Sequence, residues 1–166
     1  MPLSSAELQK LGLKYVGFGE SRQTCSSDLS TRRFRAHYGV DSPAVKALIS
    51  DLEAQGEKVN PKKLFMAICW LKLYELEEVM AGRWDFGEKY CRDTVQEYLE
   101  RIQELKKHKI SWVGMHPACK FLAVDTIHLR SEEFRCDPNS KWWSHKFNGP
   151  GVSFEVVCDP VDGKIR

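Results

Sequence analysis

One acidic residue lies inside an apolar run in the second half of the sequence. Asp125 directly follows the run 121–124, which is Phe-Leu-Ala-Val. A buried carboxylate without a partner costs several kcal/mol. Asp125 therefore needs a hydrogen-bond network that includes backbone or Arg130, a strand end open to solvent, or a metal ion. The residue types alone leave these alternatives open.

A second group of polar residues lies at the start of a long amphipathic segment. A short helix, a break near residues 82–85 and a long helix have the spacing of a helix-turn-helix, whose second helix faces the major groove of DNA. Arg92 could then pair with a guanine edge or a phosphate, and Gln96 with adenine. Asp93 does not fit such a surface, and the alternative is a bundle whose helices pack only on each other. The outward residues expected to contact DNA are Lys89, Tyr90, Arg92 and Gln96.

Two further segments combine basic residues with features of nucleic-acid contact. Arg32, Arg33 and Arg35 form a cluster that could touch phosphates, or could belong to a solvated arm. The loop near residues 141–147 is both aromatic and basic, so it could stack on bases and touch phosphate, or fold back on the core. Its candidate contact residues are Trp142, Trp143, His145 and Lys146.

Overall charge and cysteine content restrict the class of protein. The formal net charge is only +2, so DNA binding would need local basic patches. Six cysteines are present, and Cys69 and Cys91 fall on apolar faces of expected helices, where a thiol behaves as a small hydrophobic group. Without an apolar signal segment or a transmembrane run, we expect a reducing compartment, nucleus or cytosol, and no membrane partner. A zinc site among the histidines and cysteines of the second half is a weaker alternative, because paired spacing is absent.

The elements that would position these residues begin with helices. Ser42-Pro43 and Asn60-Pro61 are start signals, and they predict helices to about Ala54 and about Tyr74. A short helix is expected to begin at about Glu75 and to end at Gly82, with three of its side chains facing the core. The spacing of Asp85 and Glu88 is that of a capping box, and the long helix should run to about Lys107. The inward residues of the short helix are expected to be Leu76, Val79 and Met80.

After residue 117 the pattern changes to short apolar runs. Residues 119–129 are expected to form a strand that is buried on both faces, and residues 152–158 a second strand paired with it. A long loop over 131–150 separates them. A turn with Asp159 and Asp162 leads to the start of a third strand at 164–166, and we expect both acids at the opposite end of the second strand from Asp125.

Together these segments resemble the DDE superfamily endonucleases, most closely the Harbinger-like transposases of eukaryotes. The resemblance lies in Leu-Ala-Val-Asp-Thr at 122–126, in the tryptophan-to-glycine segment that continues to Val157, and in the stretch 159–166. Upstream, 61–74 and 88–92 are similar to the helical region of the same proteins. The resemblance covers about residues 34–166, and the glycine that often separates the family's first Asp from Thr is missing here.

The resemblance implies a ribonuclease-H-like nuclease that uses two divalent metal ions, Mg²⁺ or Mn²⁺, held by three acidic residues. Asp125 matches the first of the three, as catalytic residue and metal ligand, and the other two are absent. We therefore expect this chain alone to be inactive and not to hold the ions stably. An unpaired sheet edge after Arg166 would favour a homo-oligomer, or a partner chain that completes the sheet.

The sequence thus predicts an α+β protein in three parts. Residues 1–40 form a partly ordered arm, residues 41–110 a helical, helix-turn-helix-like domain, and residues 117–166 the first strands of an incomplete ribonuclease-H-like fold. The predicted function is that of a truncated transposase-derived protein that binds DNA. The alternatives are a non-catalytic DNA-binding protein that uses only the helices, and a protein-interaction domain with no DNA role.

Overall fold

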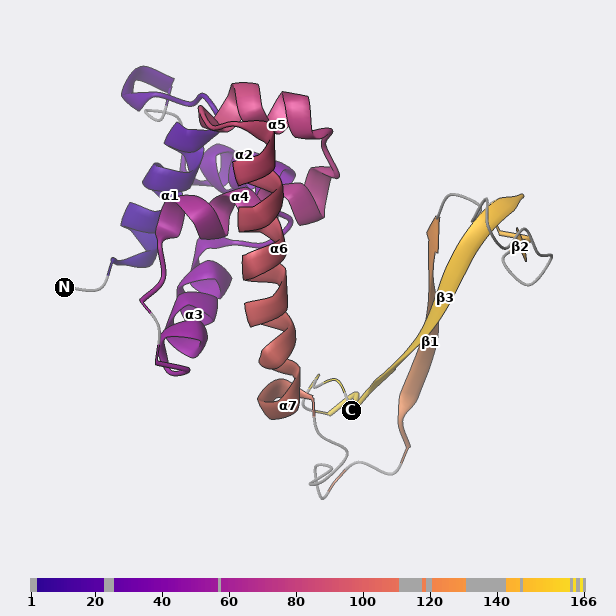
Figure 1. Ribbon diagram of the computed structural model, residues 1–166. Coiled ribbons are helices and arrows are strands. Elements are labelled where there is room, and N and C mark those ends of the chain that lie inside the picture. Colours follow the sequence, from indigo (N-terminus) through magenta and orange to yellow (C-terminus); the bar gives the residue numbers. More distant parts are fainter. Residues whose placement is uncertain are drawn as a thin grey trace. The chain divides into compact units, whose positions relative to one another are not determined.

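The computed structural model is an α+β protein that divides into two compact units, residues 1–105 and 106–166 (Figure 1). The structure describes residues 3–22, 26–56, 58–110, 118, 121–130, 143–146, 148–161, 163 and 165. In these residues no helix is long and apolar enough to cross a membrane. The helical unit contains α1 (Ser5–Tyr15), the short 3-10 helix η1 (Glu20–Arg22), α2 (Ser27–Tyr38), α3 (Ser42–Glu53), α4 (Pro61–Leu73), α5 (Glu77–Trp84) and α6 (Glu88–Glu104).

The helix starts at residues 42 and 61 are confirmed, and the cap geometry explains them. Asp41 accepts a hydrogen bond from the Ala44 backbone N–H, and Asn60 accepts from two backbone N–H groups at the start of α4. Both helices carry proline in the first turn, where no intrahelical donor is lost. The two helices end within about one residue of the predicted positions.

The described part of the stretch expected to be a partly ordered arm, residues 1–40, contains the α-helices α1 and α2, and both help to form the core. Leu8 and Leu13 of α1 and Phe34 and Tyr38 of α2 are buried. Glycine has a low helix propensity, but Gly12 lies inside α1. A Cβ atom at this position would lie 2.6 Å from Cε2 of Phe34, so glycine allows α1 to approach the aromatic core closely.

The boundary between α5 and α6 also differs from the prediction. Only Met80 of the three residues expected to point inward is buried; Leu76 is 67% exposed, and Val79 is exposed as well. The helix continues through Gly82 to the buried Trp84, which anchors its last turn. Asp85 does not cap α6: it ends α5 in the left-handed region at φ 57°, and α6 begins after Gly87 without a side-chain cap.

The core of the helical unit is centred on α4. Residues 64–69 of this helix are all buried, so α4 packs on more than one side. The hydroxyl group of Tyr98 accepts a hydrogen bond from the Asn60 backbone N–H at 2.9 Å and so ties α6 to the start of α4. Cys69 and Cys91 are free, buried thiols, and burial raises the pKa of Cys69 to about 11.

The second unit contains the short helix α7 (Lys106–Lys109) and an antiparallel sheet in the order β1-β3-β2. The strands are β1 (Ala123–Arg130), β2 (Trp143–Ser144) and β3 (Gly149–Cys158). The predicted pairing is confirmed, because Val124 lies opposite Val157. Ile165 forms a single bridge with Cys158, where we expected a third strand to begin.

The prediction that the first strand is buried on both faces is wrong for the described residues. Val124 is 61% exposed, and Ile127 and Leu129 are exposed too. Residues that lie opposite each other in an antiparallel pair share a face. The register therefore places Ile127 beside Phe154 and Leu129 beside Val152 on one apolar face. The apolar run correctly predicted a strand, but not its burial.

Candidate nucleic-acid interface

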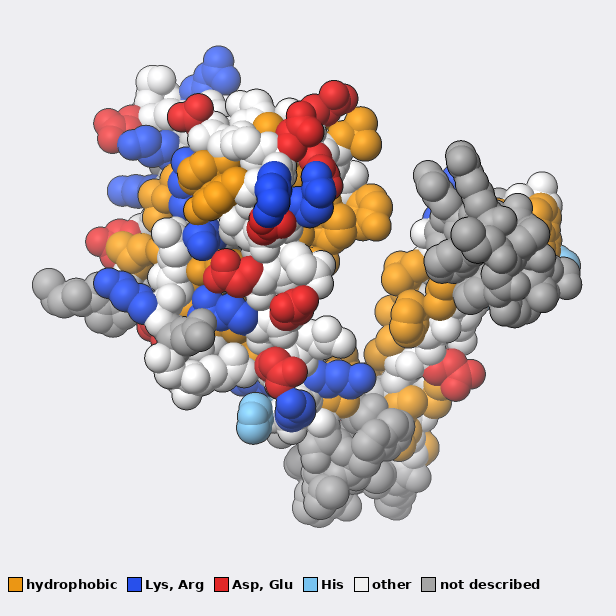
Figure 2. Space-filling model, in the orientation of Figure 1, with side chains coloured by type: hydrophobic (Ala, Val, Ile, Leu, Met, Phe, Trp, Pro, Cys, Tyr) orange, Lys and Arg blue, Asp and Glu red, His pale blue; other side chains and the backbone are white. Residues whose placement is uncertain are grey.

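The predicted DNA-contacting residues at the start of α6 are bound to acidic neighbours. The Arg92 guanidinium makes two hydrogen bonds to the Glu77 carboxylate of α5, at 2.7 and 2.6 Å, and these hold the pKa of Glu77 below its usual value. Lys89 pairs with Asp93 one turn further along the helix. Gln96 Nε2 donates to a Glu100 carboxylate oxygen at 2.7 Å. Basic and acidic side chains therefore alternate over α6 (Figure 2).

Tyr90 lies on an aromatic and cationic surface at the same end of α6. Its ring packs against Phe86 with centroids 4.5 Å apart, and the Lys63 ammonium lies 5.7 Å from the Tyr90 ring centre. Tyr90 is partly exposed, so the ring face could receive a base or a basic side chain. Residues 85–87 connect α5 and α6, which is a break of helix-turn-helix length.

The three arginines of α2 have different environments. Arg33 lies over the Phe18 ring, 4.8 Å from its centre, and donates to the carbonyl oxygen of Arg22 at 2.9 Å. Arg35 pairs with Asp41 at 3.0 Å. Arg32 is exposed and makes no hydrogen bond or ion pair within the described part of the chain, so it is the arginine of α2 most available to a phosphate.

The sheet unit gathers the described residues of the aromatic-basic loop around one hollow of about 370 Å³. Trp143, His145 and Lys146 line it from the β2 side, and His128 and Ser153 line it from the paired strands β1 and β3. The Ser153 hydroxyl and Nδ1 of His128 are 2.9 Å apart. Trp142, the fourth loop residue predicted to contact DNA, lies outside the described residues.

Ser144 also lines this hollow, and sequence reasoning missed it. It is only 6% exposed, and its hydroxyl oxygen has no hydrogen-bond partner among the described residues. A buried hydroxyl group costs free energy until something pairs with it, so a ligand that brings an acceptor would be favoured here. His128 and Ser153 were also missed, because only the strand register places them opposite each other.

Asp125 lies on β1 with an exposed side chain, and its Oδ1 accepts a hydrogen bond from the Thr126 backbone N–H at 2.8 Å. Exposure explains how this carboxylate is tolerated in an apolar run. Our expectation that Asp159 lies at the opposite end was wrong: β1 and β3 pair Ala123 with Cys158, so Asp159 follows at the same end as Asp125. Asp162 lies outside the described residues.

The described residues do not fit a site for two divalent metal ions. Asp159 is buried and uses Oδ1 to accept from the Val161 backbone N–H at 2.9 Å, inside its own turn. In the part of the chain that the structure describes, no group of three or more His, Cys, Asp or Glu side chains is placed to hold a metal ion.

The two units differ in charge. Residues 1–105 contain 15 Lys and Arg against 16 Asp and Glu, whereas residues 106–166 contain 10 against 7. The net charge of the helical unit is therefore slightly negative, and the positive charge of the chain belongs to the sheet unit. Long-range attraction of phosphate groups depends on net charge, so it should be stronger for the sheet unit than for the helical unit.

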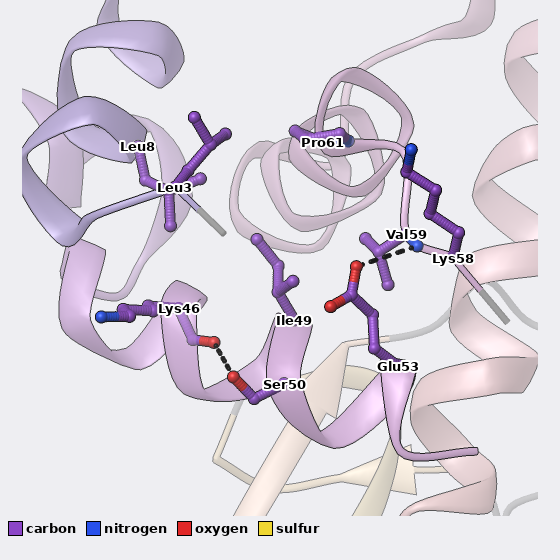
Figure 3. Close-up of a pocket in the computed structure, with 9 residues that line it drawn as sticks. All are labelled: Leu3, Leu8, Lys46, Ile49, Ser50, Glu53, Lys58, Val59 and Pro61. Carbon is purple, nitrogen blue, oxygen red and sulfur yellow. Dashed lines mark hydrogen bonds between the residues drawn. The ribbon is translucent and has the colours of Figure 1, made fainter. Parts of the chain in front are cut away.

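A separate apolar pocket of about 190 Å³ lies in the helical unit (Figure 3). Leu8 of α1 and Ile49 of α3 line it, together with Val59 and Pro61 at the start of α4. The Lys46 side chain extends away from the other labelled residues in Figure 3. None of the predicted DNA-contacting residues lines this pocket, so it does not belong to the candidate interface.

Comparison of the chain with models of protein families, with curated proteins and with solved structures finds no match.

Proposed function

We propose that this chain is a transposase-derived DNA-binding protein that does not cleave DNA by itself. The observation that supports this most is the hollow in the sheet unit. There the described loop residues expected to stack on bases and to touch phosphate, Trp143, His145 and Lys146, lie together, next to the buried hydroxyl of Ser144, which has no partner among the described residues. The excess of basic over acidic residues in the same unit also supports DNA binding.

The chemistry of the hollow suits an unstacked base and its phosphate. Trp143 is about half exposed, so its ring can receive a base, and such stacking contributes about 1–3 kcal/mol per base. Lys146 and His145 are exposed beside it, and a Lys ammonium neutralises one phosphate charge. Single-stranded DNA, or a distorted duplex, is therefore the expected ligand.

The helical unit could add a second contact through α4, α5 and α6. Both side chains of the Arg92–Glu77 ion pair are exposed, and exposed ion pairs contribute only about 0–1 kcal/mol to stability. A phosphate or a guanine edge could thus replace the carboxylate at small cost. This supports α6 as a helix-turn-helix reading helix, with the α2 arginines as phosphate contacts.

We expect the double substitution Arg92→Ala with Lys89→Ala to weaken duplex DNA affinity by about tenfold, since removing each of these charged side chains costs roughly 1 kcal/mol or less. A gel shift at low salt measures this. Lys58→Ala, which removes an exposed lysine from the α3–α4 connection, is the matched control. Unchanged affinity in the double variant would exclude the start of α6 from the interface.

We expect no cleavage or joining of DNA by the purified chain with Mg²⁺ or Mn²⁺. Two-metal phosphodiester chemistry needs ligands that hold the ions about 3.5–4 Å apart, and Asp125 offers one carboxylate. A nuclease assay with Asp125→Ala as control measures this. Cleavage by the wild type that disappears in the variant would contradict the expectation. It would also indicate that a second chain pairs with the edge strand β1 and supplies the other acids.

The experiment that tests the proposed function is a titration of fluorescently labelled single-stranded and duplex DNA at two salt concentrations. DNA binding through phosphates must weaken steeply with salt. We expect measurable affinity at low salt and a preference for the single strand. Absence of binding to both DNA forms at low salt would reject the proposal.

A second candidate function is protein interaction without DNA. It is favoured by the pairing of Arg92, Lys89 and Gln96 with acidic residues, which satisfies the polar groups expected to read DNA. The DNA titration separates the two candidates, because a protein-interaction domain would show no salt-dependent DNA affinity.

A further inference from the structure

The connection between α4 and α5 forms an open hollow of about 490 Å³ whose lining combines aromatic and acidic side chains. Trp70 and Tyr74 come from the end of α4, and Leu76 from the connection itself. Four carboxylates complete the lining: Glu75 from the connection, Glu77 and Glu78 from α5, and Glu88, the first residue of α6. None of the residues predicted to contact DNA lines this hollow.

The aromatic part of the hollow is accessible through Tyr74, while Trp70 is partly buried against the core. Tyr74 is 77% exposed, and its ring packs against Trp70 with the centroids 4.6 Å apart and the planes 36° apart. Tyr74 occupies the left-handed C-cap position of α4, at φ 54°. The faces of Trp and Tyr rings attract Lys and Arg cations, and they do so more strongly when water is excluded.

The acidic part of the hollow is only partly neutralised. Glu75 pairs with Arg83 and Glu77 pairs with Arg92, which also lies within electrostatic range of Glu88. Glu78 and Glu88 are exposed and make no hydrogen bond or ion pair within the described residues. No Lys or Arg among the described residues lines the hollow. Its field therefore repels phosphate and attracts cations, so a nucleic acid does not fit here.

The surroundings of the hollow are apolar. Leu76 is exposed inside it, and Leu71, Leu73 and Val79 are exposed on the adjoining helix ends. Figure 2 shows hydrophobic side chains beside acidic ones on the side of the helical unit where Figure 1 places this connection. Exposed apolar surface rimmed by charge is typical of protein-interaction sites.

We infer that this hollow binds a short basic segment of another protein. A Lys or Arg side chain of the segment lies over the Trp70 and Tyr74 rings, and an apolar side chain contacts Leu76. The exposed carboxylates of Glu78 and Glu88 pair with further basic residues of the segment. The charge complementarity selects a basic peptide over an acidic one, and the rings select a cation with an apolar stem.

The test is a fluorescence-anisotropy titration of the full chain into a short labelled peptide in which Lys and Arg surround one Leu. The matched probe has the same length, with Glu at each basic position. We expect binding of the basic peptide and none of the acidic one. Equal binding of both peptides, or binding of neither, overturns the inference.

Two variants test the site itself. Tyr74→Gly removes the exposed ring, while glycine suits the left-handed backbone at this position, so α4 should keep its end. Glu78→Lys with Glu88→Lys reverses the exposed charges. Each variant should weaken peptide binding about fivefold or more. Glu20→Lys, an exposed acidic residue of η1, is the matched charge control and should leave binding unchanged.

Further readouts keep the result decisive. Circular dichroism melting should show the same transition for Tyr74→Gly as for the wild type, and the charge-reversed variant should bind DNA at least as well as the wild type. Unchanged peptide affinity in both variants would overturn the inference. Analytical ultracentrifugation tests for self-association. If the wild type is a dimer that the Tyr74→Gly substitution dissociates, and no peptide binds, a second copy of the chain is the occupant and the inference is overturned.

Discussion

Gly12→Ala should destabilise the helical unit by about 1–3 kcal/mol, the usual cost of overpacking a well-filled core. The new Cβ would lie 2.6 Å from the Phe34 ring, 3.0 Å from Phe65 and 3.1 Å from Tyr38. These rings pack against each other, so none of them can move without disturbing the others. The Tyr38 hydroxyl also donates to the Gly12 carbonyl oxygen at 2.7 Å, which fixes the backbone there.

Gly82→Ala is the matched control, and its effect should have the opposite sign. Gly82 lies inside α5, and a Cβ there would meet nothing within 4 Å. Alanine in an exposed helix interior is favoured over glycine by about 0.5–1 kcal/mol. Urea unfolding followed by far-UV circular dichroism measures both variants. A neutral or stabilising effect of Gly12→Ala would contradict the packing of α1 against α2 and α4.

The starts of α3 and α4 show where prediction from the sequence succeeds, and Gly12 shows where it fails. The starts of α3 and α4 could be predicted because their signals are local: a capping side chain followed by proline. Gly12 has the local signature of a helix breaker, because nothing nearby in the sequence shows that three aromatic rings from α2 and α4 require it. Tertiary packing overrides the low helix propensity of glycine at this position.

The candidate site was predictable to a similar extent. The aromatic and basic composition of residues 143–146 pointed to nucleic-acid contact, and the structure places these residues around one hollow. His128 and Ser153 were not predictable, since their sequence separation gives no signal before the register of β1 and β3 is known. The acidic partners of Arg92 and Lys89 were missed for two reasons. Glu77 lies on a different helix, and Asp93 was seen as a misfit rather than as a partner.

Trp143→Ala should weaken binding of single-stranded DNA by about tenfold or more, because loss of one base stack costs about 1–3 kcal/mol. Trp143→Phe should restore part of the affinity, since a smaller ring still offers a face for stacking. Fluorescence anisotropy with a labelled single strand measures both variants at one salt concentration.

The matched control for this prediction is Phe154→Ala. Phe154 is an exposed aromatic residue of β3 that does not line the hollow, so its removal should leave DNA affinity unchanged. If Phe154→Ala and Trp143→Ala weaken binding equally, the loss reflects general damage to the sheet. The hollow would then not be the contact site.

The central claim, that the hollow contacts DNA phosphate, is tested most directly by the salt dependence of affinity for single-stranded DNA. Each phosphate neutralised contributes about 0.7 to the slope of log affinity against log salt. Lys146→Ala should therefore make the slope shallower by about 0.7, while Lys58→Ala should leave it as in the wild type. A wild-type affinity that does not change with salt, or equal slopes for Lys146→Ala and the wild type, would contradict the claim.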